Sequence, residues 1–221
     1  MRGSTRTTDR DQMNRLILSA LLLAAATPLF SAEPSNRSEA FRKEFLDAFQ
    51  RTGLNTTPGD AMFLRILVAS RGAKRGVEIG TASGFGAMNM GIAFERTGGH
   101  LYSLEIDPAR AKDATRNLAK IGLEKTVTVM EGDALQILPK LEGEFDFVFI
   151  DAAKPDYLKY LKALEPKLKR GAVVIADNVI VSRRAMADFL AYVESSADYE
   201  TVTIRASMEK NDGMTVSYKV R

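Results

Sequence analysis

The chain has 221 residues, a formal net charge of +3, and 45% hydrophobic and 27% charged residues, which is typical of one soluble globular domain. The absence of cysteine excludes disulfides, thiolate nucleophiles and zinc–thiolate sites, and the single histidine, His100, excludes a multi-histidine metal site. A bound metal would therefore need carboxylate and amide oxygens, which suit Mg²⁺, Ca²⁺ or Mn²⁺. No lysine- and arginine-rich block with interleaved aromatic residues is present, so nucleic-acid binding is not expected.

Residues 1–34 differ in composition from the rest of the chain. Residues 1–12 are polar, and we expect them to be disordered. Residues 13–32 place one arginine before a short apolar core and a few small residues, a pattern typical of a secretory signal peptide. Its cleavage site is imperfect, because Phe30 lies where a small residue is preferred if cleavage follows Ala32. We expect an exported or membrane-tethered protein, with a cytoplasmic one as the alternative.

Residues 35–221 are expected to form one domain that begins with helices and continues with alternating strands and helices. Apolar spacing predicts two initial helices, over 38–49 and 58–71. Apolar runs predict strands at 76–80, 101–105, 127–130, 145–150, 172–176, 199–204 and 214–220. Helices are predicted between and after them, near 85–96, 108–121, 134–140, 156–169 and 183–196.

Continuous apolar strands that alternate with helices predict a parallel sheet with both faces covered. The last two strands are joined by the short segment 205–213, which predicts an antiparallel hairpin. The expected fold is therefore α/β: a doubly wound, mostly parallel, seven-stranded sheet with a C-terminal antiparallel hairpin.

In such sheets ligands bind outside the carboxyl ends of the strands, so the residues at these ends are the first candidates for a site. The first strand runs into V-E-I-G-T-A-S-G-F-G at 77–86, where Gly80, Gly84 and Gly86 let a ligand approach the backbone. The spacing G-x-x-x-G-x-G differs from the G-x-G-x-x-G of dinucleotide-binding folds. Glu78 is unusual in a buried strand, because an unpaired buried carboxylate is costly.

Acidic residues also follow the second and third strands. Glu105 comes 25 residues after Gly80, close to the spacing at which an acidic residue binds a ribose diol. Asp107 precedes Pro108 and is expected to be a helix N-cap. Asp133, within E-G-D-A at 131–134, fits either an N-cap or an acceptor for an adenine amino group.

The fourth and fifth strands end in charged and polar residues. The stretch F-I-D-A-A-K-P-D-Y, at 149–157, supplies Asp151 and Lys154, and A-D-N-V supplies Asp177 and Asn178. Adjacent strands lie about 5 Å apart, so these oxygen donors are expected to converge. Two carboxylates and a carboxamide suit a hard divalent ion. The alternative for Asp177 and Asn178 is ordinary turn chemistry.

These motifs, in this order and spacing, resemble those of the metal-dependent, S-adenosylmethionine-dependent O-methyltransferases. That family includes catechol O-methyltransferase and the caffeoyl-CoA-type enzymes with their bacterial relatives. The resemblance covers roughly residues 38–221, including the closing N-D-G-M-T-V-S-Y-K stretch. It implies a Rossmann-like, class I methyltransferase fold and transfer of a methyl group to a hydroxyl of a catechol-like small molecule. We also expect a homodimer.

The resemblance implies a set of residues around S-adenosylmethionine. Near the methionine part it places Glu78, Gly80, Thr81, Gly84 and Gly86, with Thr57 in the segment that closes over the site. Glu105 would bind the ribose, and Asp133 and Ala134 would border the adenine.

The resemblance also implies the catalytic residues. Asp151, Asp177 and Asn178 would hold Mg²⁺ or another divalent cation such as Mn²⁺ or Ca²⁺. Lys154 would accept the hydroxyl proton, and Asp151 would lie between the metal and the methyl donor.

The sequence departs from the family pattern at several positions. Gly86 replaces a hydroxyl residue of many relatives, and there is no tryptophan, although catechol O-methyltransferase walls its catechol with tryptophans. Ala153 precedes the lysine instead. Glu209 is the candidate for the acidic residue that contacts catechol in that enzyme. These departures bear on the acceptor more than on the reaction.

Three alternative functions are less well supported by the sequence. A transfer-RNA hydroxyuridine methyltransferase is disfavoured by the lack of a basic stripe and by the export-like start. A non-catalytic S-adenosylmethionine-binding or scaffold protein gains little from charges that converge at strand ends. A nicotinamide-dependent dehydrogenase is disfavoured by the glycine spacing. An exported enzyme would also need a supply of S-adenosylmethionine, which is made in the cytosol.

Overall fold

The computed structural model describes Met1 and residues 35–221. The predicted disordered start, 1–12, and the signal-like or anchor segment, 13–32, lie outside the described residues. Of the helices in the described part of the chain, none has the length and apolar character needed to cross a membrane.

A seven-stranded sheet with the strand order β3-β2-β1-β4-β5-β7-β6 organises the domain. The pairings among β1 to β5 are parallel, and β7 runs antiparallel to both β5 and β6, as the sequence predicts. The strands are β1 (Arg75–Ile79), β2 (His100–Glu105), β3 (Val127–Glu131), β4 (Phe145–Ile150), β5 (Leu168–Ala176), β6 (Tyr199–Ile204) and β7 (Met214–Lys219).

The register brings the ends of the parallel strands to one edge of the sheet. Ile79 of β1 pairs with Leu104 of β2 and with Ile150 of β4. Ile150 in turn pairs with Ala176 of β5. The residues that follow these strands therefore lie next to one another, although they are far apart in the sequence.

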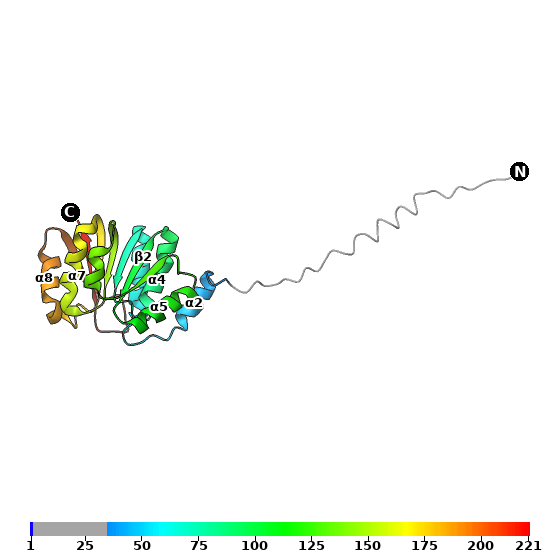
Figure 1. Ribbon diagram of the computed structural model, residues 1–221, viewed down its shortest axis with the longest axis horizontal. Helices are drawn as coiled ribbons and strands as arrows, with labels where there is room; N and C mark the ends of the chain where they lie inside the picture. Colours follow the sequence, from blue (N-terminus) through cyan, green and yellow to red (C-terminus); the bar gives the residue numbers. More distant parts are fainter. Residues whose placement is uncertain (2–34) are drawn as a thin grey trace. The chain divides into compact units, whose positions relative to one another are not determined.

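Helices cover the sheet. Helices α7 and α8 lie together at one end of the domain, and α2 lies beside α5 at the other (Figure 1). Side-chain oxygens of Ser38, Thr57 and Asp107 cap the N-termini of α2, α3 and α5, which accounts for where these helices begin. The α-helices are α2 (Glu39–Asp47), α3 (Pro58–Arg71), α4 (Phe85–Thr97), α5 (Pro108–Lys120), α6 (Ala134–Ile137), α7 (Tyr157–Leu164) and α8 (Ala187–Ser195).

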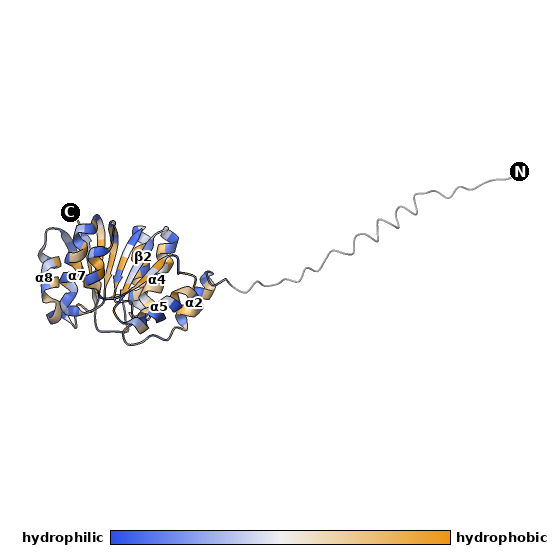
Figure 2. Cartoon of the chain, in the orientation of Figure 1, coloured by the Kyte–Doolittle hydropathy of each residue, from blue (hydrophilic) through white to orange (hydrophobic). Residues whose placement is uncertain are grey.

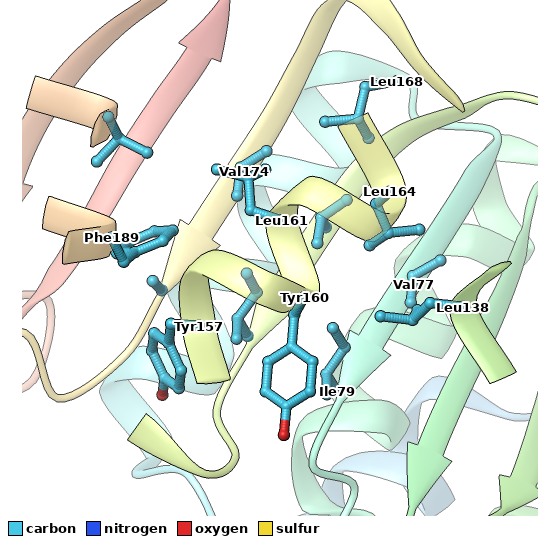
Figure 3. Packing of buried hydrophobic residues seen from close by; sticks show 14 of the residues in the cluster. Val77, Ile79, Leu138, Tyr157, Tyr160, Leu161, Leu164, Leu168, Val174 and Phe189 are labelled. Carbon is cyan, nitrogen blue, oxygen red and sulfur yellow. The ribbon is translucent and has the colours of Figure 1, made fainter. Parts of the chain in front are cut away.

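Alternate residues of the central strands supply two hydrophobic layers. Val148 and Ile150 pack into the layer under α7 and α8, whereas Phe147 and Phe149 pack into the layer under α3 and α4. Hydrophobic colour is accordingly concentrated on the central strands, while the helices also carry hydrophilic residues (Figure 2). Figure 3 shows the first of these layers, in which the Tyr157 ring meets Phe189 edge-on at 5.7 Å.

Three predicted helices are shorter than expected. The segments 134–140, 156–169 and 183–196 contain α6, α7 and α8, each joined to a short 3₁₀ turn. The 3₁₀ turns are η1 (Leu138–Lys140), η2 (Lys154–Asp156), η3 (Glu165–Lys167) and η4 (Arg183–Met186). Proline stands in the first turn of η1, η2 and η3, where its missing N–H costs little.

Strand β5 begins four residues earlier than predicted, at Leu168 rather than at 172. Lys169, Arg170 and Gly171 interrupt the apolar pattern after Leu168, so the segment resembles a loop in the sequence. Leu168 nevertheless pairs with Phe145, and a register shift separates this pair from the regular ladder.

Candidate active site

A cavity of about 720 Å³ opens at the carboxyl ends of the parallel strands, within the size range of small-molecule sites. Its wall comes from the strand ends, from the segment 51–57 before α3, and from Lys210 between β6 and β7. Most of the residues predicted for the site line it: Thr57, Gly80, Glu105, Asp133, Ala134, Asp151, Lys154, Asp177 and Asn178.

The turn after β1 brings two strand ends into direct contact. Gly80 has φ +97°, and a Cβ atom built on it would lie 2.0 Å from the carbonyl oxygen of Asp151. Only glycine fits this conformation and this approach. Ala82, with φ +48°, then directs its N–H to Glu105 Oε2 at 2.8 Å. The turn therefore fixes the positions of both Asp151 and Glu105.

Four of the predicted cofactor residues lie behind the cavity wall: Glu78, Thr81, Gly84 and Gly86. Glu78 is 1% exposed and accepts a very short hydrogen bond from Ser103 Oγ, which lies 2.6 Å from Thr81 Oγ1. Burial raises the pKa of Glu78 to about 8, so this carboxyl keeps its proton at neutral pH. Gly84 begins α4 against Ala114.

Gly86 leaves room for the Glu78 side chain. A Cβ atom at this position would lie 2.7 Å from Glu78 Oε1. A serine here would therefore crowd the buried carboxyl, which gives a structural reason for the departure from the family pattern.

Backbone and side-chain donors hold Glu105 in the cavity wall. Its Oε1 accepts from the Asp107 N–H at 3.0 Å and from Arg110 Nε at 3.1 Å. Asp107 caps α5, as predicted. Asp133 caps α6 by accepting a hydrogen bond from the Leu135 N–H at 2.9 Å, which confirms the capping interpretation. Asp133 also lines the cavity.

Lys154 is held at two points. Its Nζ lies 2.8 Å from Asp151 Oδ1 and 2.8 Å from the Tyr157 hydroxyl, which donates to the carbonyl oxygen of Asp177 at 3.2 Å. Burial and the nearby carboxylates of Asp151 and Asp177 raise the pKa of Tyr157, so the phenol stays protonated. The Tyr157 and Tyr160 hydroxyls both point toward the edge where β1 ends (Figure 3). Sequence reasoning did not identify these tyrosines.

Asp177 is buried beside a cation from the hairpin loop. Both of its carboxylate oxygens lie 2.7 Å from Lys210 Nζ, which also lies 2.8 Å from Asp60 Oδ2. Burial, and then the charge of Asp151, raise the pKa of Asp177 to about 6. Sequence reasoning missed Lys210 and Asp60, because no local pattern links them to Asp177.

The predicted metal ligands all line this cavity. Asp151 and Asp177 bring two carboxylates, and Asn178, with φ +61°, brings a carboxamide. Within residues 35–221, no group of three or more histidine, cysteine, aspartate or glutamate side chains gathers as a metal site. The set is thus limited to two carboxylates and an amide. The carboxylates of the buried Asp177 and the partly buried Asp151 repel each other and suit a divalent cation.

The segment before α3 adds polar groups that lack a protein partner. Among the described residues, Asn55 Nδ2 and Thr56 Oγ1 are buried without a hydrogen bond, and both residues line the cavity. Buried polar groups are nearly always paired, so these two suit a polar ligand. Thr57 uses its hydroxyl to cap α3. Glu209, the candidate acidic contact, forms a 3.1 Å ion pair with Arg51.

Comparison with known proteins places this geometry in a family. The model of a family described as O-methyltransferase matches residues 30–197. A catechol O-methyltransferase of Mycobacterium tuberculosis is 32% identical over 164 residues, 74% of this chain and 71% of that protein. One of Niastella koreensis is 36% identical over 131 residues, 58% of this chain. The match spans 59% of the length of the Niastella protein.

Solved structures share the fold. The O-methyltransferase TomG of Streptomyces achromogenes, in complex with S-adenosylmethionine, has a TM-score of 0.72 at 24% identity, with 97% of this chain and 100% of that chain covered. The O-methyltransferase of Bacillus cereus, in complex with S-adenosylhomocysteine, has a TM-score of 0.71 at 22% identity, with 94% and 97% covered. The sequence matches and the shared fold agree, and the chain belongs to the O-methyltransferase family.

Proposed function

We propose that this chain transfers the methyl group of S-adenosylmethionine to one hydroxyl of a vicinal diphenol, with a divalent cation and Lys154 assisting. One observation carries the proposal: Asp151, Lys154, Asp177 and Asn178 lie in the wall of the cavity that also contains Glu105. The two relatives called catechol O-methyltransferase support the choice of acceptor.

The part of the wall formed by the ends of β1, β2 and β3 is assigned to S-adenosylmethionine; we call it the cofactor half, and it comprises Gly80, Ala82, Glu105, Asp133 and Ala134. Glu105 accepts hydrogen bonds from the ribose hydroxyls, and Asp133 and Ala134 border the adenine. The remaining predicted cofactor residues shape the turn behind the wall or the segment over it: Glu78, Thr81, Gly84, Gly86 and Thr57.

The unpaired donors of Asn55 and Thr56 suit the polar methionine end of the cofactor. Both belong to the segment that forms one side of the cavity. This segment therefore helps to bind the cofactor as well as to enclose it.

The part of the wall formed by the segments that follow β4 and β5, and by Lys210, is assigned to the acceptor; we call it the acceptor half, and it comprises Asp151, Lys154, Asp177, Asn178 and Lys210. Asp151, Asp177 and Asn178 would hold Mg²⁺, or Mn²⁺ or Ca²⁺ in its place, and such an ion would supply Lewis-acid chemistry that favours the ionised form of the acceptor hydroxyl.

The residues of this half orient the acceptor and remove its proton. Lys154 accepts the hydroxyl proton at Nζ in its neutral amine form and becomes the ammonium group that Asp151 and Tyr157 hold through two 2.8 Å contacts. The acceptor oxygen forms a bond to the methyl carbon while the carbon–sulfur bond breaks and its electron pair stays on sulfur. The wall supplies orientation and excludes water.

Labelled S-adenosylmethionine and a panel of catechols and monophenols provide the test, with Mg²⁺ and with chelator. We expect label to be transferred to catechols in the presence of Mg²⁺, and little transfer to monophenols or after chelation. Transfer that is indifferent to the chelator contradicts the role of the metal. Transfer that is equal for monophenols contradicts the acceptor class.

We also propose a homodimer and an export or tether role for residues 13–32. Light scattering of the purified protein measures the oligomeric state, and a mass equal to one chain contradicts the homodimer. Cell fractionation with N-terminal sequencing tests the role of residues 13–32, and an intact chain found only in the cytosol contradicts export or tethering.

A further inference from the structure

Lys210 occupies a position that the proposed function does not explain. Its ammonium group contacts both carboxylate oxygens of Asp177 at 2.7 Å and Asp60 Oδ2 at 2.8 Å. The side chains of Asp177 and Asp60 are 2% and 1% exposed. A lysine thus lies between two buried carboxylates, on the same oxygens that a divalent ion would need.

Asp60 retains unused capacity to accept hydrogen bonds. Its Oδ2 accepts from Thr57 Oγ1 at 2.8 Å and from Lys210, whereas its Oδ1 is buried with no partner among the described residues. A carboxylate oxygen buried without a partner is costly. Lys210 can therefore gain a contact at Asp60 when it leaves Asp177.

The charges at this end of the cavity are nearly balanced without a metal. With both lysines protonated, three carboxylates, Asp60, Asp151 and Asp177, face two ammonium groups, Lys154 and Lys210, so the net charge is −1. A divalent ion changes it to +1, and a singly ionised diphenol returns it to zero. An ion that arrives alone must compete with an ammonium group that already neutralises Asp177.

We propose that Lys210 is an internal counter-cation that competes with the divalent ion for Asp177 and is retained by Asp60 when the ion binds. The inference rests on the proposed metal role of Asp177. Lys210 lowers the affinity of the ion and keeps Asp177 paired when no ion is bound. Asp60 raises that affinity by accepting the displaced ammonium group.

Mn²⁺ binding to the full-length protein tests this directly, with free Mn²⁺ measured by electron paramagnetic resonance. Lys210→Met removes the competing charge at similar length, and we expect it to bind Mn²⁺ about tenfold more tightly than wild type, since nearby charges interact strongly in a partly buried site. Lys159→Met is the matched control, because it removes an exposed ammonium group paired with Asp156 at 2.7 Å. A gain equal to that of the control overturns the proposal.

Asp60→Asn provides a test with the opposite sign. This variant leaves Lys210 without its second carboxylate, so we expect weaker Mn²⁺ binding than in wild type. Asp156→Asn is its control and is expected to change the affinity little. Unchanged or tighter binding in Asp60→Asn overturns the role of Asp60.

Thermal unfolding gives a readout that does not depend on activity. Without metal, Lys210→Met leaves Asp177 and Asp60 unpaired, so its melting temperature should be below that of wild type, and saturating Mn²⁺ should restore most of the difference. A loss that Mn²⁺ does not restore contradicts the proposal.

If wild type methylates catechols with Mg²⁺ while Mn²⁺ affinity is unchanged in Lys210→Met, this inference fails and the proposed function stands. If methyl transfer ignores chelation and no Mn²⁺ binds, the proposed metal role fails as well.

Discussion

The cofactor half and the acceptor half of the cavity are stabilised by different kinds of interaction. In the cofactor half, backbone N–H groups of Ala82 and Asp107 bind the Glu105 carboxylate together with one side chain, Arg110, and the turn at Gly80 admits no side chain. In the acceptor half, ion pairs between side chains, such as Lys154–Asp151 and Lys210–Asp177, hold the functional groups. The first half is fixed by the path of the chain, whereas the second depends on a balance of charges that a ligand or an ion can shift.

The largest effect is expected from Lys154→Met, which tests whether the acceptor half carries the chemistry. Loss of a general base typically costs about 10²–10⁴ in rate, so we expect kcat to fall by about 10³. The affinity for S-adenosylhomocysteine should stay close to that of wild type, because Lys154 contacts only its own half. Steady-state kinetics and calorimetry measure the two quantities, with Lys159→Met as the control. A kcat near that of wild type contradicts the role of Lys154.

Gly80→Ala is expected to disturb both halves, because this residue joins them. The new Cβ would lie 2.0 Å from the Asp151 carbonyl oxygen at φ +97°, so the free energy of unfolding should fall by roughly 3 kcal/mol or more. Gly72→Ala separates the two causes: Gly72 has φ +60° but no neighbour within 4 Å of a Cβ, so strain alone should cost about 1–2 kcal/mol. Urea unfolding measures the stability of both variants. An equal loss of stability in the two would contradict a steric clash between the new Cβ of residue 80 and the Asp151 carbonyl oxygen.

Glu105→Ala tests whether the cofactor half acts by itself. Hydrogen bonds to a charged group are worth about 1.5–3 kcal/mol, so binding of S-adenosylhomocysteine should weaken by roughly ten- to hundredfold. Mn²⁺ affinity should change little. Glu131→Ala, an exposed glutamate paired with Glu105 in the β2–β3 register, is the matched control in calorimetry. An equal loss of affinity for S-adenosylhomocysteine in both variants would contradict a role of Glu105 in cofactor binding.

The buried Glu78 carboxyl should make the stability of the protein depend on pH. Its pKa is about 8 in the folded protein and near 4.5 in an exposed side chain, so between these values the folded state holds a proton that the unfolded state has lost. Stability from this group is full below about pH 4.5 and decreases as the pH rises to about 8, by at most about 1.4 kcal/mol per pH unit.

Glu78→Gln removes this titration and nearly preserves the shape of the side chain. The free energy of unfolding of wild type relative to the variant should therefore decrease from pH 5 to pH 8 and then level off. Urea unfolding of both proteins at several pH values measures the difference between their free energies of unfolding. The contributions of other titrating groups are the same in both proteins and cancel in this difference. A difference that stays constant across this range contradicts a protonated Glu78.

The fold and the cofactor half were largely predictable from the sequence, because both depend on local patterns. Apolar runs marked the strands, and the ends of parallel strands must share an edge, so Glu105, Asp151 and Asp177 were expected near one another. Helix caps such as Asp107 follow from the residue type and its position. The start of β5 was predicted four residues too late, because Lys169, Arg170 and Gly171 interrupt the apolar pattern and Leu168 pairs across an irregular register.

The charge balance of the acceptor half was not predictable. Lys210 is 33 residues from Asp177 and 150 from Asp60, and its contacts require the hairpin loop to fold against the start of α3. A lysine beside a glutamate in a loop is ordinarily a solvated residue, so the sequence gives no signal of a buried role. Gly86 was likewise assigned to ligand contact, whereas the structure places it against Glu78.

The strand order has a consequence for the way the site is assembled during synthesis. The strands β1, β2 and β3 leave the ribosome first and carry Gly80 and Glu105, so the cofactor half can form early. Asp177 arrives with the end of β5, but its ammonium partner arrives only with the loop between β6 and β7. The β6–β7 hairpin therefore neutralises a carboxylate as well as extending the sheet. A nascent chain that stops before Lys210 contains the donor site with an unbalanced acceptor site beside it.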